Sequence, residues 1–284
     1  MTPLALTAVQ TYRERTFWLD RPVRSPAEAR EFVNARGFSM FWPITGVLMP
    51  SLWVATVGDR PVPNEHDDPG HVTWRWKDEA LGKRWWYYAK VLRKKGTLIS
   101  LEVAPYFYAL SENFGSPESD YLDQYRQGLL TQEAKAIYEA LLREGPLHTL
   151  ALRKATFMSG KESSYRFSRA LEALQADFKI LPVGIAEAGA WRYAYIYDCV
   201  HRHYPALPEQ AREIAISAAQ QRLVADYFHS VGAAQFRDVK KVFQWPEREL
   251  QRAVEALVEA GTLRDEVTLE KQPGRWIALA TLLS

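Results

Sequence analysis

The chain has 284 residues, a length that suits one to three compact domains with cores of ordinary size. Its 47% hydrophobic and 25% charged residues are typical of globular proteins and exclude a disordered chain, a collagen and a coiled-coil rod. The 36 basic and 34 acidic side chains give a net charge of +2, so the total charge indicates no partner.

No apolar run approaches the roughly 18 residues that cross a bilayer, and no basic segment precedes the short apolar N-terminus, as a signal peptide requires. The single cysteine, Cys199, excludes an internal disulfide framework and a metal site built from several cysteines. The segment His66–His71 carries histidines and carboxylates, but its Pro-Gly turn favours a polar surface loop. We therefore expect a soluble, cytoplasmic protein with no membrane partner, no cofactor and no metal.

The N-terminal third differs from the rest in its aromatic content. Seven of the ten tryptophans lie in the first 86 residues. A cluster of Ser, Asn, Gly and Pro at 111–120 and two prolines within 201–210 predict domain boundaries. The expected domains are 1–118, which is aromatic-rich, 119–203 and 204–284.

The middle domain shows three helix patterns and a hairpin. Residues 131–144 predict a helix, because apolar residues recur at helical spacing up to a Gly-Pro stop. A short helix over 147–156 and a third helix that begins at Ser163 or Ser164 follow. Residues 178–198 place β-branched and aromatic runs on either side of an Ala-Gly turn, which predicts a hairpin.

The last domain repeats this order. A long helix from Pro208 precedes a short helix over 236–245, a third helix with Pro246 at its first position, and a hairpin that turns at 271–274. Within the two third helices, residues 169–174 and 252–257 agree at five of six positions, at an offset of 83 residues.

Three helices followed by a hairpin are the order of a winged helix, a helix-turn-helix whose third helix usually enters the major groove of DNA. The expected fold class is therefore mainly α, α+β, with two tandem winged-helix modules. The aromatic-rich N-terminal domain is a candidate for a third, diverged winged helix. Either module could instead serve as a dimerisation or scaffold element.

The third helices of the two modules differ in charge. The last one carries Arg248 and Arg252 among four glutamates, which repel phosphate. The middle module is therefore the better candidate for DNA contact. Its candidate cations are Arg153, Lys154, Lys161, Arg166 and Arg169.

Residues 83–95 form a segment with six cations and no acid. Its cations are Lys83, Arg84, Lys90, Arg93, Lys94 and Lys95, all of them candidates for phosphate contact. On a helix, Trp85, Tyr88, Ala89 and Leu92 would face inward and the cations outward. We interpret the aromatic residues as a buried stripe rather than as base-stacking groups.

The chain resembles the AlkZ-related branch of winged-helix DNA glycosylases. The resemblance rests first on the order of elements and on the start of the middle module at Gly145-Pro146-Leu147. It also rests on four segments: 167–175, 233–245, Gly37–Trp42 and Trp74–Asp78. It implies winged-helix domains around a DNA-sized concavity. It also implies the cleavage of N-glycosidic bonds of alkylated purines, including those in interstrand crosslinks.

One departure from the family is decisive for the chemistry. Active members carry Gln-x-Gln or Gln-x-Asp shortly after a glycine, where this chain has Gly37 followed by Met40 and Trp42. Neither side chain can orient a hydrolytic water. Asp78 and Glu79 are the candidates for a substitute catalytic carboxylate. Met40, Trp42, Trp74 and Trp76 are expected to line a pocket.

We therefore expect a protein that binds double-stranded DNA, related to DNA-repair glycosylases but without the family's catalysis. One alternative is an active glycosylase that uses a different carboxylate. The other is a transcriptional regulator whose tryptophan-rich N-terminal domain binds an apolar small molecule. The sequence leaves the oligomeric state open.

Overall fold

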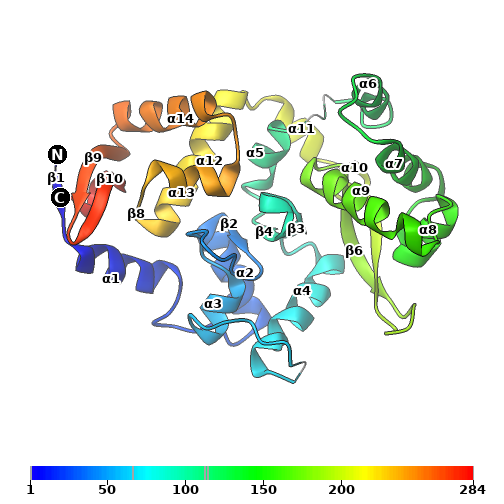
Figure 1. Cartoon of the computed structure of the whole chain (residues 1–284), viewed down its shortest axis with the longest axis horizontal. Helices are drawn as coiled ribbons and strands as arrows, with labels where there is room; N and C mark the ends of the chain where they lie inside the picture. Colours follow the sequence, from blue (N-terminus) through cyan, green and yellow to red (C-terminus); the bar gives the residue numbers. More distant parts are fainter. Residues whose placement is uncertain (1, 66, 112, 114, 284) are drawn as a thin grey trace. The chain divides into compact units, whose positions relative to one another are not determined.

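The computed structural model describes residues 2–65, 67–111, 113 and 115–283 (Figure 1). The chain divides into two compact units. Unit 1 joins the N-terminal residues through Trp76 with Thr97–Val103 and the C-terminal residues from Ile216, and unit 2 comprises Lys77–Gly96 and Ala104–Ala215. The division into domains at 118 and 203 stays a prediction, because spatial units need not coincide with independently folding domains. No helix of the described residues is long and apolar enough to cross a membrane.

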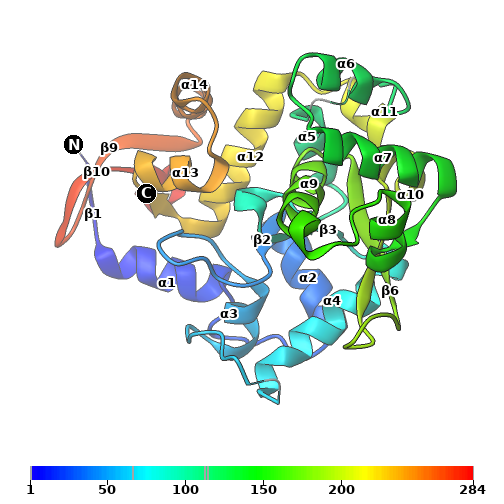
Figure 2. The same ribbon diagram turned by 45° about the vertical axis from the view of Figure 1, so that its right-hand side comes forward.

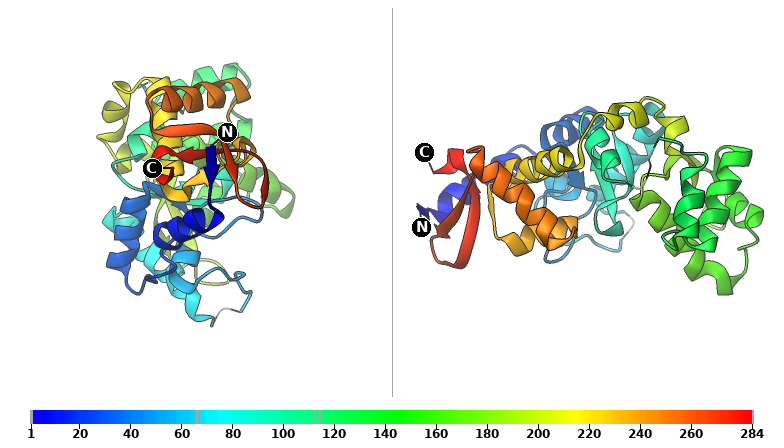
Figure 3. Two further views of the ribbon diagram at one scale, coloured as in Figure 1. Left: turned by 90° about the vertical axis from the view of Figure 1, so that its left-hand side faces the viewer. Right: turned by 90° about the horizontal axis from the view of Figure 1, so that it is seen from above.

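The C-terminal part of unit 1 has the predicted element order with one short strand added. It consists of α12 (Ile216–Val231), β8 (Ala233–Ala234), α13 (Phe236–Phe243), α14 (Glu247–Glu259), β9 (Leu263–Leu269), β10 (Gln272–Leu279) and the short 3-10 helix Ala280–Leu282. Strand β10 lies between β8 and β9 and runs antiparallel to both. The N-terminal strand β1 (Thr2–Leu4) pairs parallel with β9 and extends this sheet, as Figure 3 shows.

Three local predictions about the last module were wrong. The helix expected from Pro208 is interrupted, since α11 (Leu207–Arg212) ends before α12 begins. Pro246 precedes α14 as its N-cap, with φ −50° and ψ 134°, rather than forming its first turn. The hairpin turns at Glu270 and Lys271, and the Pro-Gly pair lies within β10, where the register shifts between Gln272 and Trp276.

The N-terminal elements of unit 1 are short. They are α1 (Leu6–Thr16), α2 (Pro26–Arg36), β2 (Phe38–Met40), α3 (Leu52–Val57), the 3-10 helix Pro69–His71 and the first part of α4 (Val72–Lys83), with β4 (Gly96–Ile99) returning to pair antiparallel with β2. Arg13 holds α1 to the C-terminal elements by donating hydrogen bonds to the carbonyls of Val231 and Ala233, at 3.0 and 2.7 Å.

Unit 2 contains the middle module. Its elements are α6 (Asp120–Arg126), α7 (Gln132–Glu144), β5 (Leu147–His148), α8 (Thr149–Ala155), the 3-10 helix Lys161–Ser163, α9 (Ser164–Ala176), β6 (Ile180–Ala186) and β7 (Ala194–Cys199). Strand β7 lies between β5 and β6. The core contains Ile137, Leu152, Leu174 and Cys199, none of them exposed to solvent. The predicted helices and hairpin of this module are confirmed, and α6 was not predicted.

Unit 2 also contains elements on either side of this module. They are β3 (Tyr87–Lys90), the 3-10 helix Leu92–Lys94, α5 (Ala104–Ala109), α10 (Val200–His203) and α11, of which α11 packs against α5 (Figure 1).

The same element order occurs three times along the chain. Helix, short strand, helix, helix and two strands run from α2 to β4, from α7 to β7 and from α12 to β10. In each case the short strand pairs antiparallel with the last strand: β2 with β4, β5 with β7, and β8 with β10. Helices α9 and α14 carry the matching hexapeptides at corresponding places. The predicted fold class, mainly α and α+β, is confirmed, and the N-terminal third has the element order expected of a third module.

Candidate nucleic-acid interface

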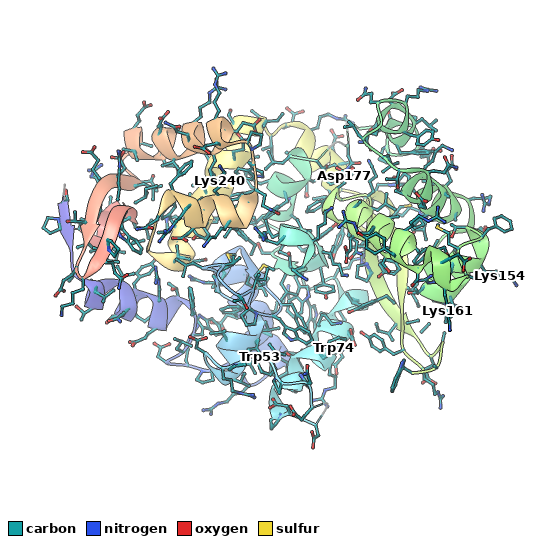
Figure 4. All side chains as sticks on the ribbon, in the orientation of Figure 1. Trp53, Trp74, Lys154, Lys161, Asp177 and Lys240 are labelled. Carbon is teal, nitrogen blue, oxygen red and sulfur yellow. The ribbon has the colours of Figure 1, made fainter. Side chains whose placement is uncertain are left out.

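The cations that the sequence singles out for DNA contact all belong to unit 2. One group lies on residues 83–95 and the other on α8, α9 and the turn that joins them. Figure 4 shows Lys154 and Lys161 at the end of unit 2 where α8 and α9 meet. In each group, one cation is already neutralised by a glutamate.

Residues 83–95 do not form the expected helix. Helix α4 ends at Lys83, Arg84 takes a left-handed φ of 51°, and β3 follows. Aromatic and β-branched residues favour a strand, and burial alternates accordingly, with Tyr87 and Ala89 buried and Lys90 exposed. The aromatic residues are largely core, as interpreted, but Trp86 and Tyr87 are the fully buried ones, whereas Trp85 and Tyr88 are only half-buried.

This segment packs against the C-terminal half of α9. The Nζ atom of Lys90 lies 2.9 Å from Glu172, and its backbone N–H donates to the side chain of Gln175 at 3.2 Å. Lys83 lies over the ring of Trp85, 4.5 Å from its centroid. Lys90 is therefore partly neutralised, and its two partners lie in the C-terminal half of α9.

Arg153 has a structural role in the turn between α8 and α9. Its guanidinium lies 4.2 Å from the ring centroid of Phe167, and it donates to the Met158 carbonyl at 3.1 Å and the Ser164 hydroxyl at 3.2 Å. These contacts fix the start of α9 relative to α8. Arg153 is therefore a poor phosphate ligand, because binding phosphate would compete with these contacts.

The remaining cations of α8 and α9 point into solvent. Lys154, Lys161, Arg166 and Arg169 are all exposed. Arg166 pairs with Glu133 at 3.0 Å, whereas Lys154, Lys161 and Arg169 have no ion-pair partner within the part of the chain that the structure describes. These three are candidates for phosphate contact, since binding phosphate would break no existing ion pair.

Sequence reasoning missed the exposed aromatic residues of this module. Phe157, Tyr165 and Trp191 are largely exposed, at 97%, 72% and 89%. The first follows α8, the second lies on the first turn of α9, and the third lies between β6 and β7. Periodicity locates buried residues, and these three fall outside the buried stripes, which is the signal that could have identified them.

The predicted pocket residues separate into core and half-exposed side chains. Met40 and Trp76 are buried, at 1% and 3% exposed. Trp42 and Trp74 are half-buried and meet at 5.3 Å between ring centroids, and His71 lies 6.4 Å from Trp42. Figure 4 labels Trp74 and Trp53. The ring of Trp53 lies 5.7 Å from that of His71. Two of the four thus meet in an aromatic cluster, and the pocket itself stays a prediction.

The block from Gly37 to Trp42 forms β2 and the residues after it. Phe38, Ser39, Met40 and Phe41 are all buried, and none of them carries a carboxylate or an amide. The carboxylate nearest to Gly37 comes from α12, since a Cβ added at Gly37 would lie 3.3 Å from Asp226 Oδ2. Burial raises the pKa of Asp226, although Arg222 pairs with it at 2.9 Å and opposes that shift.

Asp78, one of the two catalytic candidates, is the partner of a buried lysine. Lys77 Nζ lies 2.6 Å from Asp78 Oδ1, 3.3 Å from the Tyr193 hydroxyl, and also contacts the Tyr195 hydroxyl. The Tyr193 hydroxyl in turn donates to Asp78 at 3.0 Å. The negative charge of Asp78 is thus already balanced, which disfavours it as the stabiliser of an oxocarbenium ion. Glu79 is exposed.

Burial shifts the pKa values of the side chains in this cluster. It lowers the pKa of Lys77, whose side chain is 0% exposed, to about 8, although Asp78 favours the charged form. It raises the pKa of Tyr88, beside Tyr195, to about 12. Among the described residues no group of three His, Cys, Asp or Glu side chains is arranged to hold a metal ion, and His66 lies outside those residues.

Comparison with known proteins connects this geometry to a family. The sequence model described as AlkZ-related matches residues 23–244. The chain belongs to the AlkZ-related family. The DNA glycosylase AlkZ of Streptomyces sahachiroi has a similar structure, with a TM-score of 0.60 over 98% of this chain and 70% of that chain, at 13% sequence identity. This AlkZ-related chain therefore has an AlkZ-like fold, and the predicted resemblance is confirmed. No curated protein matches it.

Proposed function

We propose that this AlkZ-related protein binds double-stranded DNA through the middle module and lacks the family's catalysis. The observation that carries the proposal is the group of exposed, unpaired cations at the junction of α8 and α9: Lys154, Lys161 and Arg169. In this proposal the module is a winged helix, α9 is its reading helix, and the N-terminal half of α9 approaches the major groove.

The charge on α14 supports the choice of module. Arg248 and Arg252 share that helix with Glu247, Glu249, Glu255 and Glu259. Glu247 pairs with Lys240, and Glu249 accepts a hydrogen bond from Gln220 at 2.8 Å. Phosphate that approaches α14 meets several carboxylates, which weakens the attraction of its two arginines.

Binding to duplex DNA should depend strongly on salt and weakly on sequence. Lysine and arginine contacts to phosphate release counterions, and the candidate face presents few amide side chains that read base edges. We expect the affinity to fall roughly tenfold or more between 50 and 200 mM salt, as two or more phosphate contacts imply, with similar values for unrelated duplexes. Fluorescence anisotropy with several labelled duplexes at a series of salt concentrations measures both quantities. An affinity that does not change with salt would contradict the proposal.

The purified protein should not excise alkylated purines from duplex DNA. The Gly37–Trp42 block offers no carboxylate or amide side chain to orient water, and Lys77 neutralises Asp78. Release of alkylated base, measured by chromatography after incubation with alkylated DNA, should equal that of a buffer control.

A second candidate function is excision that uses another carboxylate. The observation in its favour is Asp226, which is mostly buried beside Gly37 and whose pKa burial raises in spite of the pairing with Arg222, a property that suits a general acid or base. Robust excision that Asp226→Asn abolishes, and that Asp78→Asn and Glu79→Gln retain, would establish this candidate in place of the first.

A further inference from the structure

Three aromatic side chains extend from unit 2 into solvent, and we name them the aromatic tips: Phe157, Tyr165 and Trp191. Figures 1 and 2 both show the β6–β7 hairpin, whose connecting loop carries Trp191, extending past the helices of the module. All ten tryptophans lie within the residues that the structure describes, and Trp191 alone among them is largely exposed to solvent. Large apolar side chains left in water on a globular protein mark contact sites when they gather in one region.

The backbone of Phe157 is strained. Its φ is +56°, in the left-handed region that costs a bulky residue free energy and that usually holds glycine after a helix. The turn is fixed on both sides, because the Phe157 N–H donates to the Lys154 carbonyl at 3.2 Å and the Met158 N–H to the Arg153 carbonyl at 2.8 Å. Met158 is buried, so the turn directs Phe157 outward.

Two of the aromatic tips have a cation nearby, and the third is followed by one in the chain. The Arg169 guanidinium lies 6.0 Å from the ring centroid of Tyr165. Lys154 and Phe157 line the same shallow pocket at the end of α8. Arg192 follows Trp191 in the chain and is 79% exposed, although it pairs with Glu187. A flat apolar ring beside a cation matches a nucleotide, which presents a base next to a phosphate.

The aromatic tips lie on segments of one module that are joined to α8. The hairpin is attached to α8, because the Thr149 hydroxyl donates to the Tyr195 carbonyl at 3.2 Å. Its loop also approaches α8, since a Cβ added at Gly189 would lie 3.4 Å from Leu150 Cδ1. The turn with Phe157 leads from α8 to the first turn of α9. The three rings are thus carried by segments of one module that contact α8 or follow it in the chain.

We propose that the aromatic tips stack on unpaired bases, so that the protein prefers DNA with unstacked bases, such as a bulge, over regular duplex DNA. The proposal rests on the DNA binding proposed above and adds the class of DNA structure. Isolated rings on separate segments, two of them near a cation, suit separate bases, whereas insertion into a lipid surface would favour a continuous apolar face.

The test compares a duplex, the same duplex with an unpaired bulge, and anionic lipid vesicles. We expect the wild-type protein to bind the bulged DNA about tenfold more tightly than the duplex, since stacking one base on one ring gives roughly that factor. Phe157→Ala combined with Trp191→Ala should remove this preference and change duplex affinity by less than about threefold. Leu129→Ala removes another exposed apolar side chain of unit 2, 61% exposed, and should keep the preference.

Two further variants separate stacking from simple apolar contact. Trp191→Phe keeps a flat ring and should keep the preference, whereas Trp191→Leu should lose it. Bulged DNA should also quench tryptophan fluorescence in the wild type, with Trp191→Phe showing little quenching. Folding of each variant is checked by circular dichroism.

The outcomes distinguish this inference from the proposed function. Binding to neither DNA would refute the proposed function. Equal binding to duplex and bulge by the wild type, with salt dependence intact, would refute the inference alone. Binding to vesicles that Phe157→Ala and Trp191→Ala abolish, with DNA preference unchanged, would assign the aromatic tips to a membrane instead.

Discussion

Reversing the charges of Lys161 and Arg169 together should weaken binding to duplex DNA by about 100-fold in 0.1 M salt. Each phosphate contact contributes roughly a factor of ten at that ionic strength, and neither side chain has an ion-pair partner among the described residues. The slope of log affinity against log salt should fall by about two. Anisotropy titrations of Lys161→Glu/Arg169→Glu at several salt concentrations measure both effects.

The matched control is Arg248→Glu/Arg252→Glu on α14, whose carboxylates already offset those two arginines, and we expect a loss of less than about tenfold. Arg166→Glu/Arg169→Glu should fall between the two, because Glu133 already pairs with Arg166 at 3.0 Å. If the α14 variant lost more affinity than the α9 variants while all remained folded, the C-terminal module would be the DNA-binding one.

The free energy of unfolding should depend on pH because Lys77 is buried. Burial lowers the pKa of this lysine to about 8, so below that pH the folded state holds a charge in a poorly solvated site. Between about pH 8 and 10.5 the folded lysine is neutral while the unfolded one is still protonated. The unfolded state then binds more protons, so the free energy of unfolding rises with pH through this window.

The comparison that isolates this effect is with Lys77→Met, which removes the titrating group. From pH 7.5 to 10.5 the free energy of unfolding of the wild type should increase by about 3 kcal/mol relative to the variant. Urea unfolding at each pH measures the difference. Lys83→Met removes an exposed lysine from the same helix and should show no comparable rise. A difference between the wild type and Lys77→Met that stays constant over this range would contradict the assignment.

The local elements of the middle module were predictable because their signals are local. Thr131 caps α7 by accepting the Ala134 N–H at 3.2 Å, and Gly145 ends that helix with φ +84°. The apolar spacing of α9 leaves Phe167 and Leu174 buried. The matching hexapeptides then predicted that the C-terminal module repeats this order, and it does.

The errors arose where neighbouring segments outweigh the local pattern. Residues 83–95 could form an amphipathic helix by spacing, but Tyr87 is instead buried in a strand and stacks on Phe178 at 4.5 Å. Pro273 and Gly274 resemble a turn, yet the register of β9 and β10 places the turn three residues earlier, at Glu270 and Lys271. Strand β1 could not be assigned from three residues, because its partner β9 lies at the other end of the chain.

For the candidate site, too, some properties follow from the sequence alone and others only from the tertiary structure. Residue types alone determined that Gly37–Trp42 lacks a carboxylate or amide side chain and that residues 83–95 carry six cations and no acid. Only the tertiary structure decided which of those cations are available, because ion pairs such as Arg166 with Glu133 join residues far apart in sequence. It also decided that Asp78 is neutralised by a fully buried lysine and that Phe157 and Trp191 are exposed, since burial depends on which segments pack over a side chain and not on its own identity.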